Sequence, residues 1–244
     1  MEDMLVPDAV VGPKTIAAID RFQSKQFDNK PDGRIDPNGA TLARLNELVA
    51  AQSLNARIVQ VARGEELFWQ NGQRNETDAA VSLRLVDYWA AVGQDFSEAQ
   101  MQDEEFHAKW PWSAAFVSWV MQRAGAGEHF KYSAAHRVYT SAAKHNRQEN
   151  NDNPFKAFRV AEKKPQVGGV IVNYRSGSLV SYDNVDNGDS HKTHGDIVIA
   201  TNGKEAIVIG GNVGNSVRKR TVALNDQGHL ESEAYFAVVI VEED

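Results

Sequence analysis

The sequence contains no cysteine among its 244 residues, which excludes disulfide bonds, thiolate metal sites and cysteine catalysis for this chain. It also lacks a long run of Lys or Arg, and its net charge is −7, so we expect no nucleic-acid partner. No apolar run has the length needed to cross a bilayer, so we expect no membrane span. The acidic start, Met1–Leu5, lacks the pattern of a signal peptide, so we expect synthesis in the cytoplasm without a cleaved signal.

The composition is that of a soluble globular protein, with 42% hydrophobic and 24% charged residues. Helical periodicity dominates up to about residue 145, and strand patterns begin at Phe155. The strands are expected at 158–160, 169–174, 194–200, 206–212, 217–224 and 235–241. Helices followed by an antiparallel sheet predict an α+β fold.

The stretch from Trp110 to Gly125 organises the rest of the chain. Its apolar residues recur every three or four positions, which predicts a helix over Ser113–Arg123 that ends before Gly125. Ser113 therefore falls at or near a helix N-terminus. Two interpretations remain open there: an N-cap, or a nucleophile whose developing charge is stabilised by free N–H groups and the helix dipole.

The motif formed by Pro111, Trp112, Phe116, Val117 and Gly125 resembles the nucleophile helix of the papain-like bacterial cell-wall hydrolases, the CHAP and NlpC-type amidases and endopeptidases. Those enzymes have cysteine at the position of Ser113. Trp-Ser-Ala-Ala-Phe, followed by Tyr-Ser-Ala-Ala-His over 132–136, more closely resembles an uncharacterised bacterial domain family in which serine is native. The resemblance implies a papain-like domain over about 55–244 that cleaves an amide bond in the peptide stem of peptidoglycan.

On this resemblance Ser113 is the nucleophile and His194 its general base, with Asn212 or Asp196 orienting the imidazole. His136 is a second candidate active-site histidine; its alternative is a buried, hydrogen-bonded core residue. Candidate substrate contacts are Trp110, Trp112 and Tyr132.

The pairing of His194 with Asn212 depends on the register of the predicted hairpin. If Ala200 pairs with Ala206, His194 lies directly opposite Asn212, whereas a strict two-residue turn places Gly211 there. A serine hydroxyl is also a far weaker acid than a thiol. A protein that binds the cell wall without cleaving it, or an adaptor on the same fold, is therefore the alternative function.

Residues 1–50 are expected to form a separate helical module. Two short amphipathic helices follow related Pro- and Thr-containing segments. The module resembles the small helical peptidoglycan-binding domains. The positions that match their pattern are Gly12, Pro13, Thr15, Phe22, Gln23, Asp32 and Gly33. The segment from Asp32 to Gly39 also resembles modules on toxins and spikes of contractile secretion systems. This implies peptidoglycan, a secretion spike and an immunity protein as partners of an antibacterial effector, acting in the periplasm or after secretion. The alternative is a docking module that binds no glycan.

A metal site is a third hypothesis. Asp183, Asp186, Asp189, His191 and His194 lie close together in the sequence, and carboxylate and imidazole groups bind Ca²⁺ or Zn²⁺. Their spacing fits neither an EF-hand nor a zincin helix. We therefore expect a solvated acidic loop and no metal or other cofactor.

Overall fold

The structure is a computed structural model that describes residues 11–28, 30–175, 178, 180–188 and 192–242. The chain divides into two compact units, Met1–Ser53 and Leu54–Asp244. The order of elements confirms the α+β class, since helices occupy the first part of the larger unit and an antiparallel sheet follows.

The smaller unit contains helices α1 (Pro13–Gln26) and α2 (Ala40–Ala50). Pro13 stands in the first turn of α1, where its missing N–H has no intrahelical acceptor to lose.

Gln23, which is buried, organises the loop between these two helices. Its amide nitrogen donates to the side chains of Asp32 and Thr41, at 2.7 and 3.0 Å, and its amide oxygen accepts from the backbone N–H of Asp32 and Gly33. Gly33 has φ +65°, and a Cβ there would lie 2.7 Å from Ile16 Cγ2. The loop therefore depends on the Gln23 side chain and on the glycine.

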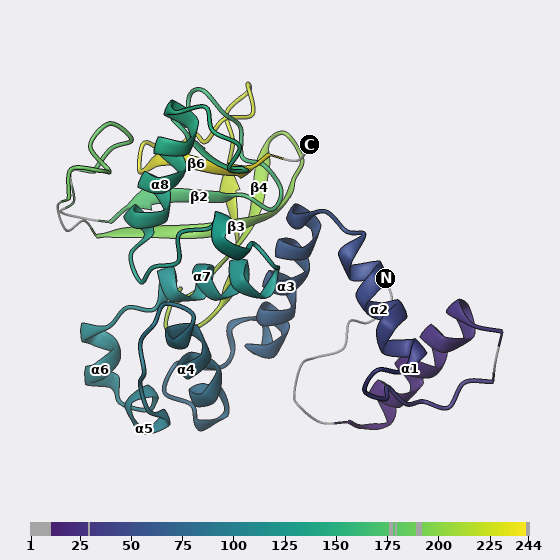
Figure 1. Ribbon diagram of the computed structural model, residues 1–244. Coiled ribbons are helices and arrows are strands. Elements are labelled where there is room, and N and C mark those ends of the chain that lie inside the picture. Colours follow the sequence, from purple (N-terminus) through teal and green to yellow (C-terminus); the bar gives the residue numbers. More distant parts are fainter. Residues whose placement is uncertain (1–10, 29, 176–177, 179, 189–191, 243–244) are drawn as a thin grey trace. The chain divides into compact units, whose positions relative to one another are not determined.

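The larger unit begins with a series of helices (Figure 1). The α-helices are α3 (Leu54–Phe68), α4 (Ser82–Ala90), α5 (Glu98–Met101), α6 (Glu104–Lys109), α7 (Ser113–Arg123) and α8 (His136–Gln148), with 3₁₀ turns η1 (Gln70–Gly72), η2 (Ala79–Val81) and η3 (Gly127–His129). The helix predicted around Ser113 is present with the predicted bounds. Helix α8 begins at His136, after a loop that contains Tyr132 and Ser133. Ser133 Oγ accepts from the N–H of Ala135 in the preceding loop, so this serine closes a turn outside the helix.

Six strands form one antiparallel sheet in the order β1-β6-β2-β3-β4-β5. Their bounds are β1 (Phe155–Phe158), β2 (Val170–Tyr174), β3 (Thr193–Thr201), β4 (Glu205–Gly210), β5 (Arg218–Ala223) and β6 (Tyr235–Val241). Strands β2 to β5 follow one another as a meander, and β6 inserts between β1 and β2. The first strand is predicted at 158–160, but β1 lies earlier and ends at Phe158. Its position follows from its pairing with Val238–Val241 of β6.

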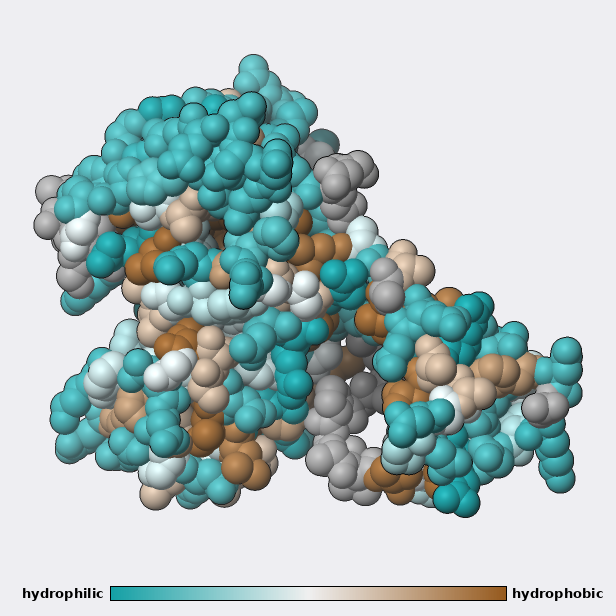
Figure 2. Space-filling view, viewed as in Figure 1, coloured by the Kyte–Doolittle hydropathy of each residue, from teal (hydrophilic) through white to brown (hydrophobic). Residues whose placement is uncertain are grey.

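The sheet separates two apolar clusters. Val170, Val172 and Ile197 belong to the large cluster that contains the helices, and α7 and α8 both pack on β3. Ile171, Val198 and other residues that alternate with these belong to a smaller cluster. Hydrophilic residues dominate the visible surface of the larger unit around α8 (Figure 2). Among the described residues, no helix has both the length and the apolar character needed to cross a membrane.

Candidate active site

Ser113 is the first residue of α7, and its hydroxyl does not cap the helix. The N-cap is Trp112, which makes no side-chain capping bond. Ser113 Oγ lies instead 2.7 Å from Nε2 of His136, and both side chains are buried. The N-cap interpretation of Ser113 is therefore wrong, and the hydroxyl takes part in a Ser–His contact at the N-terminus of a buried helix.

His136 is the first residue of α8 and is held from both sides of its ring. Its Nδ1 lies 2.6 Å from the hydroxyl of Tyr139, which is three residues further along the same helix. Ser118 on α7 accepts from the N–H of Ser133 and donates to its carbonyl, at 3.1 and 3.0 Å. This link fastens the loop before α8 to the helix that carries Ser113, so it fixes the distance between Ser113 and His136.

His194 does not contact Ser113 as expected; the contact with the serine comes from His136. The guanidinium of Arg175 donates to His194 Nδ1 at 3.1 Å, so Nδ1 is the acceptor and Nε2 carries the proton. Nε2 in turn lies 3.2 Å from Asp196 Oδ1. Both ring nitrogens of His194 are therefore engaged, although its ring centroid lies only 5.7 Å from that of His136.

Asp196 is fully buried and orients His194, as one of the two sequence alternatives expected. It also accepts an ion-paired hydrogen bond from Arg220 on β5. Burial acts to raise the pKa of Asp196, but the hydrogen bond from His194 and the charge and hydrogen bond of Arg220 outweigh it, so the pKa lies below its ordinary value. The carboxylate is therefore ionised and paired within the sheet.

Asn212 does not pair with His194, because the last pair of the ladder between β3 and β4 is Ile197 with Ile209, and β4 ends at Gly210. The predicted pairing of Ala200 with Ala206 is wrong by one residue, since Ala200 pairs with Ile207. A bulge between Val198 and Ala200 then restores the predicted register, with Ile197 opposite Ile209. Asn212 lies beyond the strand in a left-handed conformation, with φ 56°.

Two glycines allow the helices to approach the sheet at this site, and a third leaves room for the Asp196 side chain within the sheet. A Cβ on Gly195 would lie 2.5 Å from the Tyr139 hydroxyl, and one on Gly211 would lie 2.5 Å from Phe116 Cβ of α7. On Gly210, a Cβ would lie 2.0 Å from Asp196 Oδ1. The absence of side chains at these positions is therefore part of the site's construction.

The charge state of His136 follows from its surroundings. Burial, the neighbouring His194 and the cationic Arg175 together hold the pKa of His136 well below its ordinary value. Burial and the charge of Asp196 raise the pKa of Tyr139 well above its own. At neutral pH the site therefore holds a neutral imidazole beside a neutral phenol.

The aromatic residues assigned to substrate differ in their accessibility. Trp112 is fully buried and stacks on Trp69, so its assignment as a substrate contact is wrong; it is a core residue. Trp110 is 42% exposed and packs on Phe106. Tyr132 is half-buried and donates to the carbonyl of Gly127 at 2.9 Å.

Glu76 is a further residue that supports the site and that the sequence pattern did not single out. It is buried, and its Oε2 accepts from Trp112 Nε1 at 2.6 Å. Its backbone N–H donates to the carbonyl of Asn215, in the loop after β4. Glu76 therefore ties the residue preceding Ser113 to the loop that follows Gly211.

The acidic loop proposed as a metal site forms ion pairs instead. Asp183 pairs with Arg159, and Asp186 pairs with Lys144 at 2.9 Å. Asp189 and His191 of that hypothesis lie outside the described residues. Within the described part of the chain, no group of three His, Asp or Glu side chains is placed to hold a metal ion.

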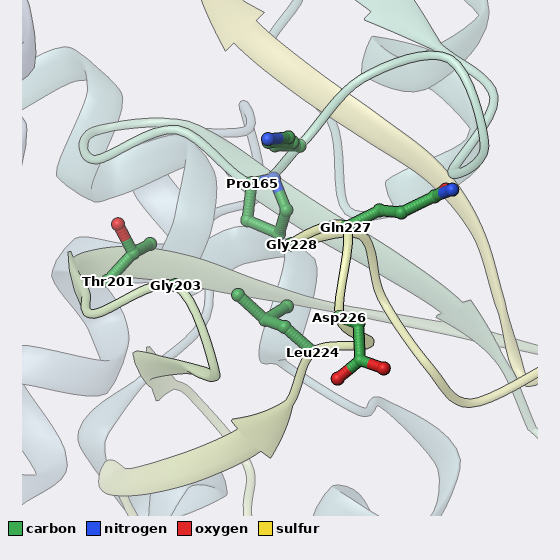
Figure 3. Close-up of a pocket in the computed structure, with 8 residues that line it drawn as sticks. Pro165, Thr201, Gly203, Leu224, Asp226, Gln227 and Gly228 are labelled. Carbon is green, nitrogen blue, oxygen red and sulfur yellow. The ribbon is translucent and has the colours of Figure 1, made fainter.

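A pocket lies beside the end of β3 (Figure 3). Its lining includes Thr201 at the end of β3, Lys164 and Asp226. Thr201 is seven residues along the strand from His194, which corresponds to about 23 Å at ~3.3 Å per residue. The pocket is therefore separate from the candidate active site.

No curated protein and no solved structure matches the chain. One family model matches residues 65–238, more than half of the chain, and its description is "Uncharacterized protein conserved in bacteria (DUF2272)". The matched range includes Ser113, His136, Tyr139 and His194, and it excludes the smaller unit. The chain therefore belongs to this bacterial family, DUF2272.

Proposed function

We propose that the larger unit is a serine-dependent hydrolase that cleaves an amide bond in the peptide stem of peptidoglycan. The observation that carries the proposal is the 2.7 Å contact between Ser113 Oγ and His136 Nε2 at the N-terminus of α7. A nucleophile, a base within hydrogen-bond reach and a group that orients the base form the arrangement needed for nucleophilic catalysis. Here these are Ser113, His136 and Tyr139.

The proposed reaction begins when Ser113 attacks the carbonyl carbon and its proton moves to His136 Nε2. Throughout this step Nδ1 of His136 keeps its own proton and donates a hydrogen bond to the oxygen of the Tyr139 hydroxyl, which holds the ring in the tautomer that leaves Nε2 free to accept the serine proton. The N–H groups in the first turn of a helix have no intrahelical acceptor, so those of α7 stabilise the negative oxygen. His136 returns the proton to the leaving amine, and water then hydrolyses the acyl-serine.

The substrate class in this proposal rests on the resemblance of the Ser113 helix to cell-wall hydrolases. Trp110, exposed three residues before Ser113, and the half-buried Tyr132 remain the proposed substrate contacts. The smaller unit is proposed to bind the glycan or a secretion spike, and an antibacterial role would require an immunity protein as partner.

One observation favours a second candidate function, binding of the wall without cleavage. The third group of the site is a phenol, which stabilises an imidazolium less than a carboxylate does, and the lowered pKa of His136 makes it a weak base. A site of this kind binds a stem peptide and turns it over slowly or not at all.

Digestion of purified peptidoglycan distinguishes the two functions. The intact chain and the Ser113→Ala variant are incubated with the wall, and released fragments are identified by mass spectrometry. Stem-peptide fragments released by the intact chain and absent with Ser113→Ala support hydrolysis and identify the bond. If neither protein releases fragments and both sediment with the insoluble wall, the result supports binding of the wall without cleavage.

Delivery by a contractile secretion system is tested separately, by comparing secreted fractions of a producing strain with and without an active system. Absence of the chain from the secreted fraction of the active strain would overturn that part of the proposal.

A further inference from the structure

Two cationic side chains lie at the ends of the strands that lead to the candidate active site. Arg175 follows β2 and Lys192 precedes β3, and the N–H of Arg175 donates to the carbonyl of Lys192 at 2.8 Å. This bond continues the ladder in which Tyr174 pairs with Thr193, so the two cations stand directly opposite each other. Both are exposed.

Like charges in directly opposite positions destabilise a sheet. In the described part of the chain, neither Arg175 nor Lys192 forms an ion pair, whereas Arg220 on the same sheet is paired with the buried Asp196. The chain has a net charge of −7, so it contains more acidic side chains than basic ones, and a shortage of acidic residues does not explain why these two cations lack ion pairs. An anion bound between the two cations would remove the repulsion.

Arg175 also has guanidinium N–H groups that are available to a ligand, and it lies close to the reacting groups. A guanidinium has five N–H donors, and one of those of Arg175 is used by His194 Nδ1. The His194 ring lies 5.7 Å from that of His136, which contacts Ser113. The charge of Arg175 is close enough to His136 to contribute to its lowered pKa.

We propose that Arg175 and Lys192 form a binding subsite for a free carboxylate of the peptide substrate, beside the bond that Ser113 attacks. This inference rests on the proposed function and specifies its substrate class. The planar fork of a guanidinium matches a carboxylate with two parallel hydrogen bonds, and the ammonium of Lys192 adds a second positive charge.

Substrate binding at this subsite has a consequence for the base. A carboxylate on Arg175 neutralises the cation that disfavours a proton on His136, so the imidazole becomes a better proton acceptor once substrate is bound. A peptide amide without a free carboxylate would lack this effect.

The test separates binding from hydrolysis by using the Ser113→Ala protein. A synthetic wall stem peptide is titrated calorimetrically, and its free carboxylates are converted to carboxamides one at a time. We expect one of these conversions to weaken binding by about 10- to 100-fold, the range for losing hydrogen bonds to a charged group. Adding Arg175→Gln should weaken binding of the acid peptide by a similar factor and abolish the difference between acid and amide.

Two further variants act as controls. Arg63→Gln removes an equal charge from an exposed position on α3 and should leave both affinities unchanged. Arg175→Lys keeps the charge and loses the fork, so it should give intermediate affinity.

Equal affinity of the Ser113→Ala protein for all acid and amide peptides would overturn the inference, as would an unchanged preference in Arg175→Gln. If the acid preference is present and depends on Arg175 but the intact chain cleaves nothing, the subsite stands and the hydrolase proposal fails. If the intact chain cleaves acid and amide peptides equally well, hydrolysis stands and the subsite fails.

Discussion

At the scale of single residues, the two histidines of the site differ in what their ring nitrogens contact. His136 contacts Ser113 and Tyr139, while His194 contacts Arg175 and Asp196. A histidine that serves as base to a serine needs one nitrogen directed at the hydroxyl. This geometry favours His136 as the base and gives His194 a supporting position next to it.

Replacing each histidine separately tests this assignment. We expect His136→Asn to lower kcat for stem-peptide hydrolysis by about 10²- to 10⁴-fold, the contribution of general base catalysis. His194→Asn should cause a smaller loss, because the Ser113–His136 contact stays in place. Circular dichroism should first show that both variants are folded. A larger loss of kcat in His194→Asn than in His136→Asn would then contradict the assignment.

The pH dependence of the reaction is a second prediction at this scale. The base must be neutral to accept the serine proton, and the pKa of His136 is held well below its ordinary value by burial, His194 and Arg175. We therefore expect kcat/KM to stay constant as pH falls past about 6.5, the ordinary histidine pKa, and to decrease only at lower pH. An acidic limb centred at or above that value in a pH–rate profile would show that another group is the base.

At the scale of elements, the close approach of α7 to the sheet depends on glycine. Phe116 of α7 lies against Gly211, and a Cβ there would lie 2.5 Å from the Phe116 Cβ. Neither atom is at the end of a flexible side chain, so the helix or the strand end must move to accept a methyl group.

We expect Gly211→Ala to lower the free energy of unfolding by about 1–3 kcal/mol, the usual cost of overpacking a core. It should also lower kcat, because moving α7 moves Ser113. Gly64→Ala is the matched control: Gly64 lies in α3 with nothing within 4 Å of an added Cβ. That variant should gain about 0.5–1 kcal/mol from helix propensity. Urea unfolding measures both, and equal stability of the two variants would contradict the packing argument.

At the scale of the whole molecule, the charged and titratable groups of the site link stability to pH. The unfolded chain binds a proton on His136 below about pH 6.5, whereas the folded chain keeps that residue neutral to a lower pH. Asp196 acts in the same direction at more acidic pH, because its folded pKa is below its ordinary value. Stability should therefore fall as pH decreases, first through His136 and then through Asp196.

The expected slope from His136 is at most about 1.4 kcal/mol per pH unit between its unfolded and folded pKa values. Urea unfolding of the larger unit at pH 7.5 and pH 5 measures this loss, and His136→Asn should lose less stability over that interval. An equal loss in the variant and the intact chain would show that other groups determine the acid sensitivity.

Sequence patterns predicted the α+β class, the helix over Ser113–Arg123 and the positions of most strands. They also singled out Ser113, His136, His194 and Asp196, which lie together at the site. Local periodicity carries this information, because a helix or strand buries one face and repeats its apolar residues accordingly. The motif around Ser113 and the segment from Tyr132 to Tyr139 both contribute side chains to the site.

The partner that each of these side chains contacts depends on how the elements pack together in the tertiary structure. The bulge in β3 and the end of β4 at Gly210 leave Asn212 without the expected pairing, and such details of register have no signal in hydrophobic periodicity. Likewise, the burial of Trp112 depends on Glu76 and Trp69, which are distant in sequence. Periodicity places a residue on a face of its own element, but the packing of one element on another sets whether that face meets a histidine, an aromatic ring or solvent.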